Sequence, residues 1–178
     1  MDRAAQTRVK RGRLVAIDGV DLQAVRAAAR EAVRSIGAPH CGVSHWDASG
    51  VFHELDLVDG AASPRTLLLL YAADLAFRAR WEIAPALAEG RTIVAAPYVA
   101  TATAFGRAVG LDRSWLANLL QFAPRQTEAH VVDAGREALT RPVGFLRVAS
   151  ARWAAPAGID RAALTQEMAR HLRRPARR

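Results

Sequence analysis

The feature that most constrains the fold is an alternation of short apolar runs with longer stretches of helical periodicity. A parallel strand is buried on both faces and therefore reads as a continuous apolar run, and successive parallel strands need a helical crossover between them. Five runs fit this description: Arg13–Asp18, a weaker one at His40–Ser44, then Arg91–Ala96, Ala129–Asp133 and Gly144–Val148. The pattern predicts an α/β fold with a five-stranded parallel sheet.

Helix-start and helix-stop signals separate these runs. Asp21 is placed to cap a helix that runs to Arg34, and Ser63-Pro64 combines an N-cap with a proline at the first helical position. This second helix is the longest; it should end at Gly90, and Pro85 is expected to kink it near that end. Two further helices are predicted over residues 113–122 and 161–172, each beginning after an aspartate.

Length and charge limit the number of domains and the classes of partner. A chain of 178 residues, 51% of them hydrophobic, can bury one core and is too short for two ordinary domains. No apolar run is long enough for a membrane span or a signal peptide, so we expect a cytoplasmic protein with no membrane contact. The formal net charge of +8 is concentrated toward the ends. Residues 1–12 and 173–178 are therefore predicted to be mobile basic segments, which either bind nucleic acid weakly and non-specifically or only aid solubility.

Three segments in the middle of the chain, Ser63–Asp74, Ile83–Gly90 and Thr92–Val94, resemble the thymidylate kinase family in order and spacing. The resemblance continues through Val15–Asp21, Gly110–Asp112, Trp115–Leu116 and Ala129–Asp133, so that residues 13–172 form one thymidylate-kinase-like domain. It implies a P-loop kinase fold with strand order 2-3-1-4-5, helices on both faces of the sheet, and a homodimer.

The phosphate-binding loop of that family, Glu-Gly-x-Asp-Gly-x-Gly-Lys-Ser/Thr, corresponds here to residues 18–26. Three residues match it: Asp18, Gly19 and Asp21. Leu22 and Ala24 replace glycines that let backbone N–H groups curl around phosphate, and Val25 replaces the lysine that neutralises it. Arg26 replaces the hydroxyl, but it lies about 100° around the helix from the lysine position and is a poor substitute for it. The loop has lost the features that bind phosphate.

The family's other functional segments are also altered. Its Asp-Arg-Tyr motif, whose arginine grips the monophosphate, reads Ala96-Pro97-Tyr98 here, and its Arg-Glu-Pro-Gly-Gly-Thr loop corresponds to residues 44–49, which share none of its phosphate-binding residues. On the long helix Tyr71 matches the aromatic residue that stacks on thymine, while Leu75 replaces the arginine that hydrogen-bonds the base. Residues 134–143 leave no room for the helical lid that closes over the phosphates.

A cluster of possible metal ligands lies near the second strand: His40, Cys41, His45, Asp47 and His53. The spacing matches neither a Cys-x-x-Cys pair nor a His-Glu-x-x-His helix, and the chain has a single cysteine. Metal binding and cysteine catalysis remain minor alternatives, and a structural or solvent-facing role for these side chains is favoured. We expect no metal ion.

The long helix also bears on the oligomeric state. Leu67–Ala73 are seven consecutive uncharged residues, and at 100° per residue they cover every side of the helix. One side can pack on the sheet, and the other needs a second cover. A symmetric contact between two copies would supply it, through Leu68 and Tyr71 together with Trp115 and Leu119. The alternative is burial beneath the chain's own loops.

Several independent losses in one site predict a catalytically inactive thymidylate-kinase-like protein that acts as a binding or scaffolding subunit. Remnants of the nucleotide cleft are expected at Asp18, Gly19, Asp21, Arg26, Tyr71 and Tyr98, with no catalytic residue and no cofactor. Besides a second copy, an unknown protein is a predicted partner, and an active paralogue is one candidate. The alternative is a divergent nucleotide kinase or nucleotide-binding enzyme that uses ATP and Mg²⁺, and the third reading is a basic module that associates with nucleic acid.

Overall fold

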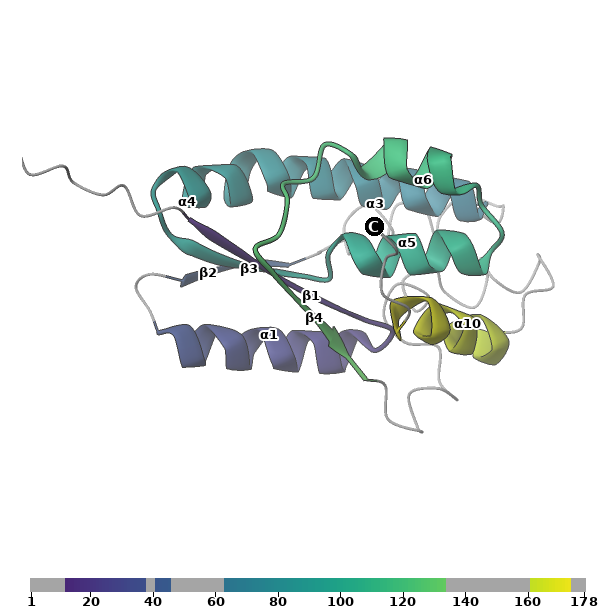
Figure 1. Ribbon diagram of the computed structural model, residues 1–178, viewed down its shortest axis with the longest axis horizontal. Coiled ribbons are helices and arrows are strands. Elements are labelled where there is room, and N and C mark those ends of the chain that lie inside the picture. Colours follow the sequence, from purple (N-terminus) through teal and green to yellow (C-terminus); the bar gives the residue numbers. More distant parts are fainter. Residues whose placement is uncertain (1–11, 38–40, 46–62, 134–160, 174–178) are drawn as a thin grey trace, which may run out of the picture.

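Four parallel strands form the centre of the fold (Figure 1). The computed structural model describes residues 12–37, 41–45, 63–133 and 161–173. The strands are β1 (Arg13–Gly19), β2 (Cys41–His45), β3 (Thr92–Ala96) and β4 (Glu128–Val132), and they lie side by side in the order β2-β3-β1-β4. This confirms the predicted order as far as the fourth strand. The predicted fifth strand, Gly144–Val148, lies outside the described residues.

Helices cover both faces of the sheet, as predicted (Figure 1). α1 (Leu22–Ile36) packs on one face. α3 (Pro64–Arg78), α5 (Val99–Ala108) and α10 (Arg161–Arg173) contribute to the core on the other face, and α6 (Arg113–Leu120) packs against α3 and α5. Within the described part of the chain, no helix is both long and apolar enough to cross a membrane.

The central strand β1 divides the core in two. Its side chains alternate between the faces of the sheet, so that Leu14 and Ala16 pack toward α3 and α5 while Val15 and Ile17 pack toward α1. Every residue of β1 after Arg13 is buried. The continuous apolar run in the sequence is thus explained by burial on both faces.

The longest helix contains a wider turn near its proline. α3 continues without a break into a π-helical turn, η1 (Ala79–Ile83), and then into α4 (Ala84–Ala88). Pro85 has no N–H group to donate to the carbonyl four residues earlier, and just before it the Ala84 N–H group bonds five residues back, to the Ala79 carbonyl. The irregularity predicted at Pro85 is therefore a π-helical turn that precedes the proline.

Gly106 allows α5, α6 and α3 to approach closely. A Cβ atom at this position would overlap the end of the Leu116 side chain and lie 3.0 Å from Leu68 Cδ1. Both leucines are buried, so neither side chain has free space into which it can move.

We expect Gly106→Ala to lower the free energy of unfolding by about 1 kcal/mol, because overpacking costs about 1–3 kcal/mol and alanine regains about 1 kcal/mol of helix propensity. Urea unfolding measures the change. Leu116→Val removes the overlapping methyl groups, so Gly106→Ala should cost less in that background. Equal costs in the two backgrounds would contradict this account.

Candidate functional site

The predicted nucleotide cleft lies at the carboxyl ends of β1 and β3, where open α/β sheets bind ligands. The structure brings several of the predicted residues together there. Asp18 and Gly19 end β1, Asp21 precedes α1, and Tyr98 precedes α5. The hydrogen bonds of these residues decide which of their polar groups a ligand could reach.

Asp18 is buried and acts as a cap for α5. Its Oδ1 atom accepts hydrogen bonds from Tyr98 N at 2.8 Å, Thr101 N at 2.9 Å and Thr101 Oγ1 at 2.7 Å. Tyr98 occupies the N-cap position of α5 and its side chain makes no capping bond, so a carboxylate from β1 satisfies the first turn instead. Burial raises the pKa of Asp18, and the hydrogen bonds from Thr101 and Tyr98 oppose that rise. The carboxyl group ties β1 to α5.

Three backbone N–H groups of the segment that corresponds to a phosphate loop are bonded within the chain. Asp21 Oδ1 accepts hydrogen bonds from Gln23 N at 2.9 Å and Ala24 N at 3.2 Å, which makes Asp21 the N-cap of α1. Gly19 N donates to Thr101 Oγ1 at 3.1 Å. Helix N-termini bind anions through such N–H groups, and here the protein's own carboxylate occupies that place at α1.

The two positions that replace the lysine and hydroxyl of a phosphate loop point in different directions. Val25 is fully buried in the core between α1 and the sheet, and a Cβ atom on Gly19 would lie 2.8 Å from its Cγ2 atom. Arg26 is half-buried. The pKa of His45, at the end of β2, is lowered mainly by burial and further by the charges of Arg26, Arg78 and Arg30. The Arg26 charge therefore acts at the end of β2.

Two tyrosines expected in the cleft are part of the core. Tyr71 and Tyr98 are both 0% exposed. The Tyr71 hydroxyl donates to the Tyr98 carbonyl oxygen at 2.7 Å, and the Tyr98 hydroxyl donates to the Pro124 carbonyl oxygen at 2.6 Å. Burial raises the pKa of Tyr98 to about 12. Neither side chain has an exposed ring face on which a base could stack, which corrects the interpretation of Tyr71 as a stacking residue.

Arg78 is a feature of this region that the sequence interpretation missed. Its side chain is buried, with Nε 2.7 Å from Asp74 Oδ2 and Nη1 3.4 Å from Ser44 Oγ. Nη2 is also buried and has no hydrogen-bond partner in the described part of the chain, although the Arg78 charge lowers the pKa of Tyr71 against the larger effect of burial. The Asp74–Arg78 spacing of four residues was the available signal, since such pairs meet on a helix.

One cavity lies near the former phosphate loop among the described residues, and it is small. A cavity of ≈30 Å³ lies between Val20, the end of β4 and α10, with Val132 and Leu172 in its lining. Drug-sized ligands occupy sites of about 300–1,000 Å³, and a cavity of this size holds about one water molecule.

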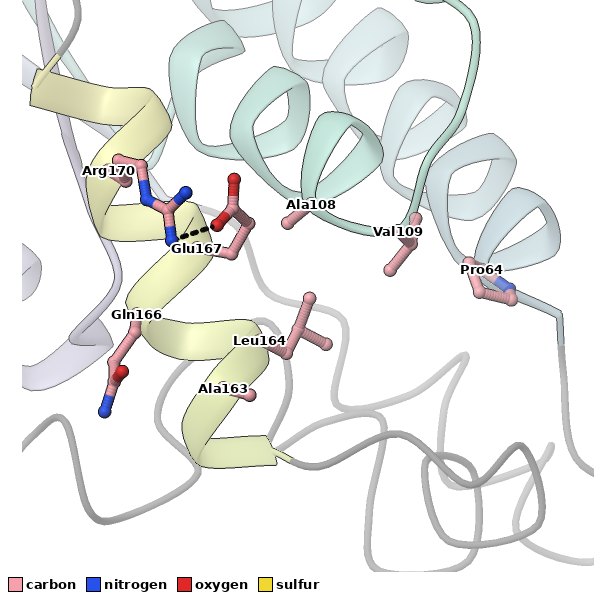
Figure 2. A pocket seen from close by; sticks show the side chains of 8 residues that line it. All are labelled: Pro64, Ala108, Val109, Ala163, Leu164, Gln166, Glu167 and Arg170. Carbon is pink, nitrogen blue, oxygen red and sulfur yellow. Dashed lines mark ion pairs between the residues drawn. The ribbon is translucent and has the colours of Figure 1, made fainter.

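A larger cavity of ≈520 Å³ lies between the beginning of α3, the end of α5 and α10 (Figure 2). Its lining includes Pro64, Val109 and Leu164, and the ion pair between Glu167 and Arg170, with 2.7 Å between Oε2 and Nη2, lies at one side. None of the predicted cleft residues lines this cavity.

The possible metal ligands do not form a cluster in the part of the chain that the structure describes. Cys41 and His45 lie at opposite ends of β2. Burial raises the pKa of the Cys41 thiol. His40, Asp47 and His53 lie outside the described residues.

The side chains predicted to form a dimer contact have different environments. Leu68, like Tyr71, is 0% exposed and packs in the chain's own core, so neither side chain can reach a second copy. Trp115 and Leu119 are partly buried against the same core. The large apolar side chains that this long helix exposes are others, Leu69, Phe77 and Trp81.

Comparison with known proteins identifies relatives over part of the chain. No protein-family model matches it. A probable thymidylate kinase of Pyrococcus horikoshii is 37% identical over 81 residues, which is 45% of this chain and 40% of that protein. A probable thymidylate kinase of Pyrococcus abyssi is 35% identical over 78 residues, which is 43% of this chain and 38% of that protein. The match thus spans about two fifths of the length of these curated relatives.

The crystal structure of thymidylate kinase from Ehrlichia chaffeensis is similar in fold. It superposes with a TM-score of 0.57 at 14% sequence identity, covering 78% of this chain and 82% of that chain. At this level of sequence identity the superposition shows that the two chains share a fold.

Asp18→Ala would leave three donors without their acceptor, and we expect it to lower the free energy of unfolding by about 3–5 kcal/mol. Asp18→Asn keeps an oxygen at the acceptor position and should cost less. Thermal unfolding followed by circular dichroism measures both, with Asp133→Ala, an exposed aspartate after β4, as the control. An Asp18→Ala variant as stable as the control would contradict the capping role.

Proposed function

We propose that this chain is a catalytically inactive protein that serves as a binding or scaffolding subunit. It is related in sequence to the thymidylate kinases and shares their P-loop kinase fold. The observation that carries the proposal is that backbone N–H groups of the former phosphate loop are hydrogen-bonded to side chains of the same protein. The N–H groups of Gln23, Ala24 and Gly19 donate to acceptors within the chain. A phosphate would have to displace Asp21 and Thr101 to reach them.

The residues present do not fit ATP with Mg²⁺, the ligands that the fold implies. Phosphoryl transfer depends on positioning and on neutralising charge, and a single arginine finger contributes about 10³–10⁵ in rate. At the position of the family's lysine this chain has the buried Val25, and at the position of the monophosphate-binding arginine it has the buried Pro97. Even if these losses are far from additive, little catalysis should remain.

One observation favours the alternative, a divergent nucleotide-binding enzyme. Asp74 pairs with Nε of the buried Arg78, but Nη2 lacks a hydrogen-bond partner among the described residues, and an acceptor oxygen of a ligand could supply one. A ligand that binds only the folded state raises its melting temperature with concentration. Thermal shifts with thymidine monophosphate, ATP and Mg²⁺ therefore separate the two readings.

We expect the purified protein not to transfer phosphate from ATP to thymidine monophosphate in a coupled assay. The physical reason, among the described residues, is that Val25 stands at the lysine position and that the N–H groups of Gly19, Gln23 and Ala24 already have acceptors within the chain. Asp21→Asn, which retains an oxygen that can cap α1, is the matched variant. Steady turnover that the variant loses, and that a contaminant therefore cannot explain, would overturn the proposal.

We expect Val25→Lys not to create activity and to lower the free energy of unfolding by about 3–5 kcal/mol, because it buries an uncompensated charge. Val25→Met is the control, since it adds a flexible apolar chain at the same position. Equal stability of the two variants, or ATP binding by Val25→Lys, would contradict the assignment of this position to the core.

A further inference from the structure

Basic side chains from three elements gather at the carboxyl end of β2, a strand at the edge of the described sheet. Alternate residues of a strand point to opposite faces. Cys41 and Val43 pack on the α1 side, so His45 points to that side as well, and Ser44 points to the α3 side. The end of β2 is therefore bordered by α1 on one face of the sheet and by α3 on the other (Figure 1).

On the α3 side the guanidinium group of Arg78 is buried and only partly bonded. The side chain is 2% exposed. Its Nε atom pairs with Asp74 and its Nη1 atom with Ser44, while Nη2 has no hydrogen-bond partner among the described residues. An arginine keeps its charge when buried, so a buried Nη2 atom without an acceptor costs free energy. An acceptor oxygen from a ligand would recover that cost.

On the α1 side two further arginines approach the same strand end. Arg26 and Arg30 are four residues apart, so they lie on the same side of the helix, about 6 Å apart along its axis. Arg26 is half-buried and Arg30 is exposed, and neither forms an ion pair with a described residue. The charges of Arg26, Arg78 and Arg30 lower the pKa of His45 further than burial alone does. All three guanidinium groups thus act at the end of β2.

These arginines carry more positive charge than their carboxylate partner offsets. Asp74 pairs with Arg78, which leaves the two positive charges of Arg26 and Arg30. The lowered pKa keeps His45 neutral near pH 7. Guanidinium groups that gather around one point are typical of sites that bind oxyanions. A ligand with two negative charges would balance this set.

The available donors favour a carboxylate over a phosphate. Phosphate sites use backbone N–H groups at helix N-termini, and at α1 the Asp21 side chain occupies two of these groups. The donors described around the end of β2 are side-chain guanidinium groups, whose planar fork matches a carboxylate. A carboxylate has two oxygens to satisfy and a phosphate group has at least three, and each buried oxygen without a donor costs free energy.

We propose that the carboxyl end of β2 is a binding site for a small dicarboxylate. One carboxylate group accepts a hydrogen bond from Arg78 Nη2, and the charges of Arg26 and Arg30 hold the other. Of the residues predicted to remain from a nucleotide cleft, Arg26 alone takes part. The inference goes beyond the proposed function, and it holds whether or not the chain transfers phosphate.

Isothermal titration calorimetry of the full chain with succinate tests the site. The unmodified protein should bind succinate, and binding should weaken as sodium chloride is raised, because salt screens partly exposed charges. The neutral analogue succinamide should not bind, and inorganic phosphate should bind about tenfold more weakly than succinate. A protein that does not bind succinate overturns the site. Phosphate that binds as tightly as succinate overturns the choice of a carboxylate.

Matched variants test where the ligand binds. Arg78→Lys keeps a positive charge beside Asp74 but removes Nη2, and should weaken succinate binding by about tenfold or more. Because Arg78 is buried, circular dichroism must first show that this variant is folded. Arg26→Gln and Arg30→Gln change the site from its surface and should each weaken binding by about two- to fivefold. Arg34→Gln, one turn further along α1 at an exposed residue paired with Glu31, is the control and should bind like the unmodified protein.

Equal affinity in Arg26→Gln, Arg30→Gln and Arg34→Gln would overturn the location. Nuclear magnetic resonance gives a second measurement, since bound succinate should raise the pKa of His45 by offsetting the arginine charges. A His45 pKa that does not move on saturation with succinate also overturns the location. The kinase assay measures a different property, so failure of this site and failure of the proposed inactivity are distinguishable.

Discussion

The carboxylate of Asp18 connects the central strand to α5, a helix whose first turn has no side-chain cap of its own. The residues that donate to Asp18 make further hydrogen bonds. Thr101 Oγ1 also accepts a hydrogen bond from Gly19 N. Tyr98, whose N–H group binds Asp18, accepts a hydrogen bond from the Tyr71 hydroxyl at its carbonyl oxygen. The Tyr98 hydroxyl in turn donates to the Pro124 carbonyl oxygen. One buried carboxyl group thus organises β1, α3, α5 and the segment that leads to β4, because each donor that it satisfies belongs to a residue with a further partner.

This arrangement occupies backbone N–H donors at the carboxyl ends of β1 and β3. A phosphate-binding loop keeps its N–H groups available for an anion, as helix N-termini do at such sites. Here Asp21 takes the donors at the beginning of α1, and Asp18 is committed to α5. The matching residues of the family's loop are therefore present in sequence, but they serve the stability of the fold. Resemblance at Asp18, Gly19 and Asp21 does not imply resemblance in function.

The outward side of the long helix differs from this edge of the sheet, since it exposes large apolar side chains. Its sheet-facing residues are buried, and its other side exposes Leu69, Phe77 and Trp81. The π-helical turn η1, which precedes Pro85, leaves Trp81 on that exposed face.

The sequence by itself determined the four described strands and most helix starts, because apolar runs and capping residues such as Asp21 act on neighbouring residues. The order of these strands was what the resemblance to the thymidylate kinase family implied. It missed α5, whose valine and threonine residues are poor helix formers and whose cap is Asp18, 83 residues from Thr101. It also placed Leu68 and Tyr71 at a dimer surface. Seven uncharged residues in a row do not indicate which side of a helix faces the sheet, and only long-range packing decides which of those side chains loses contact with water.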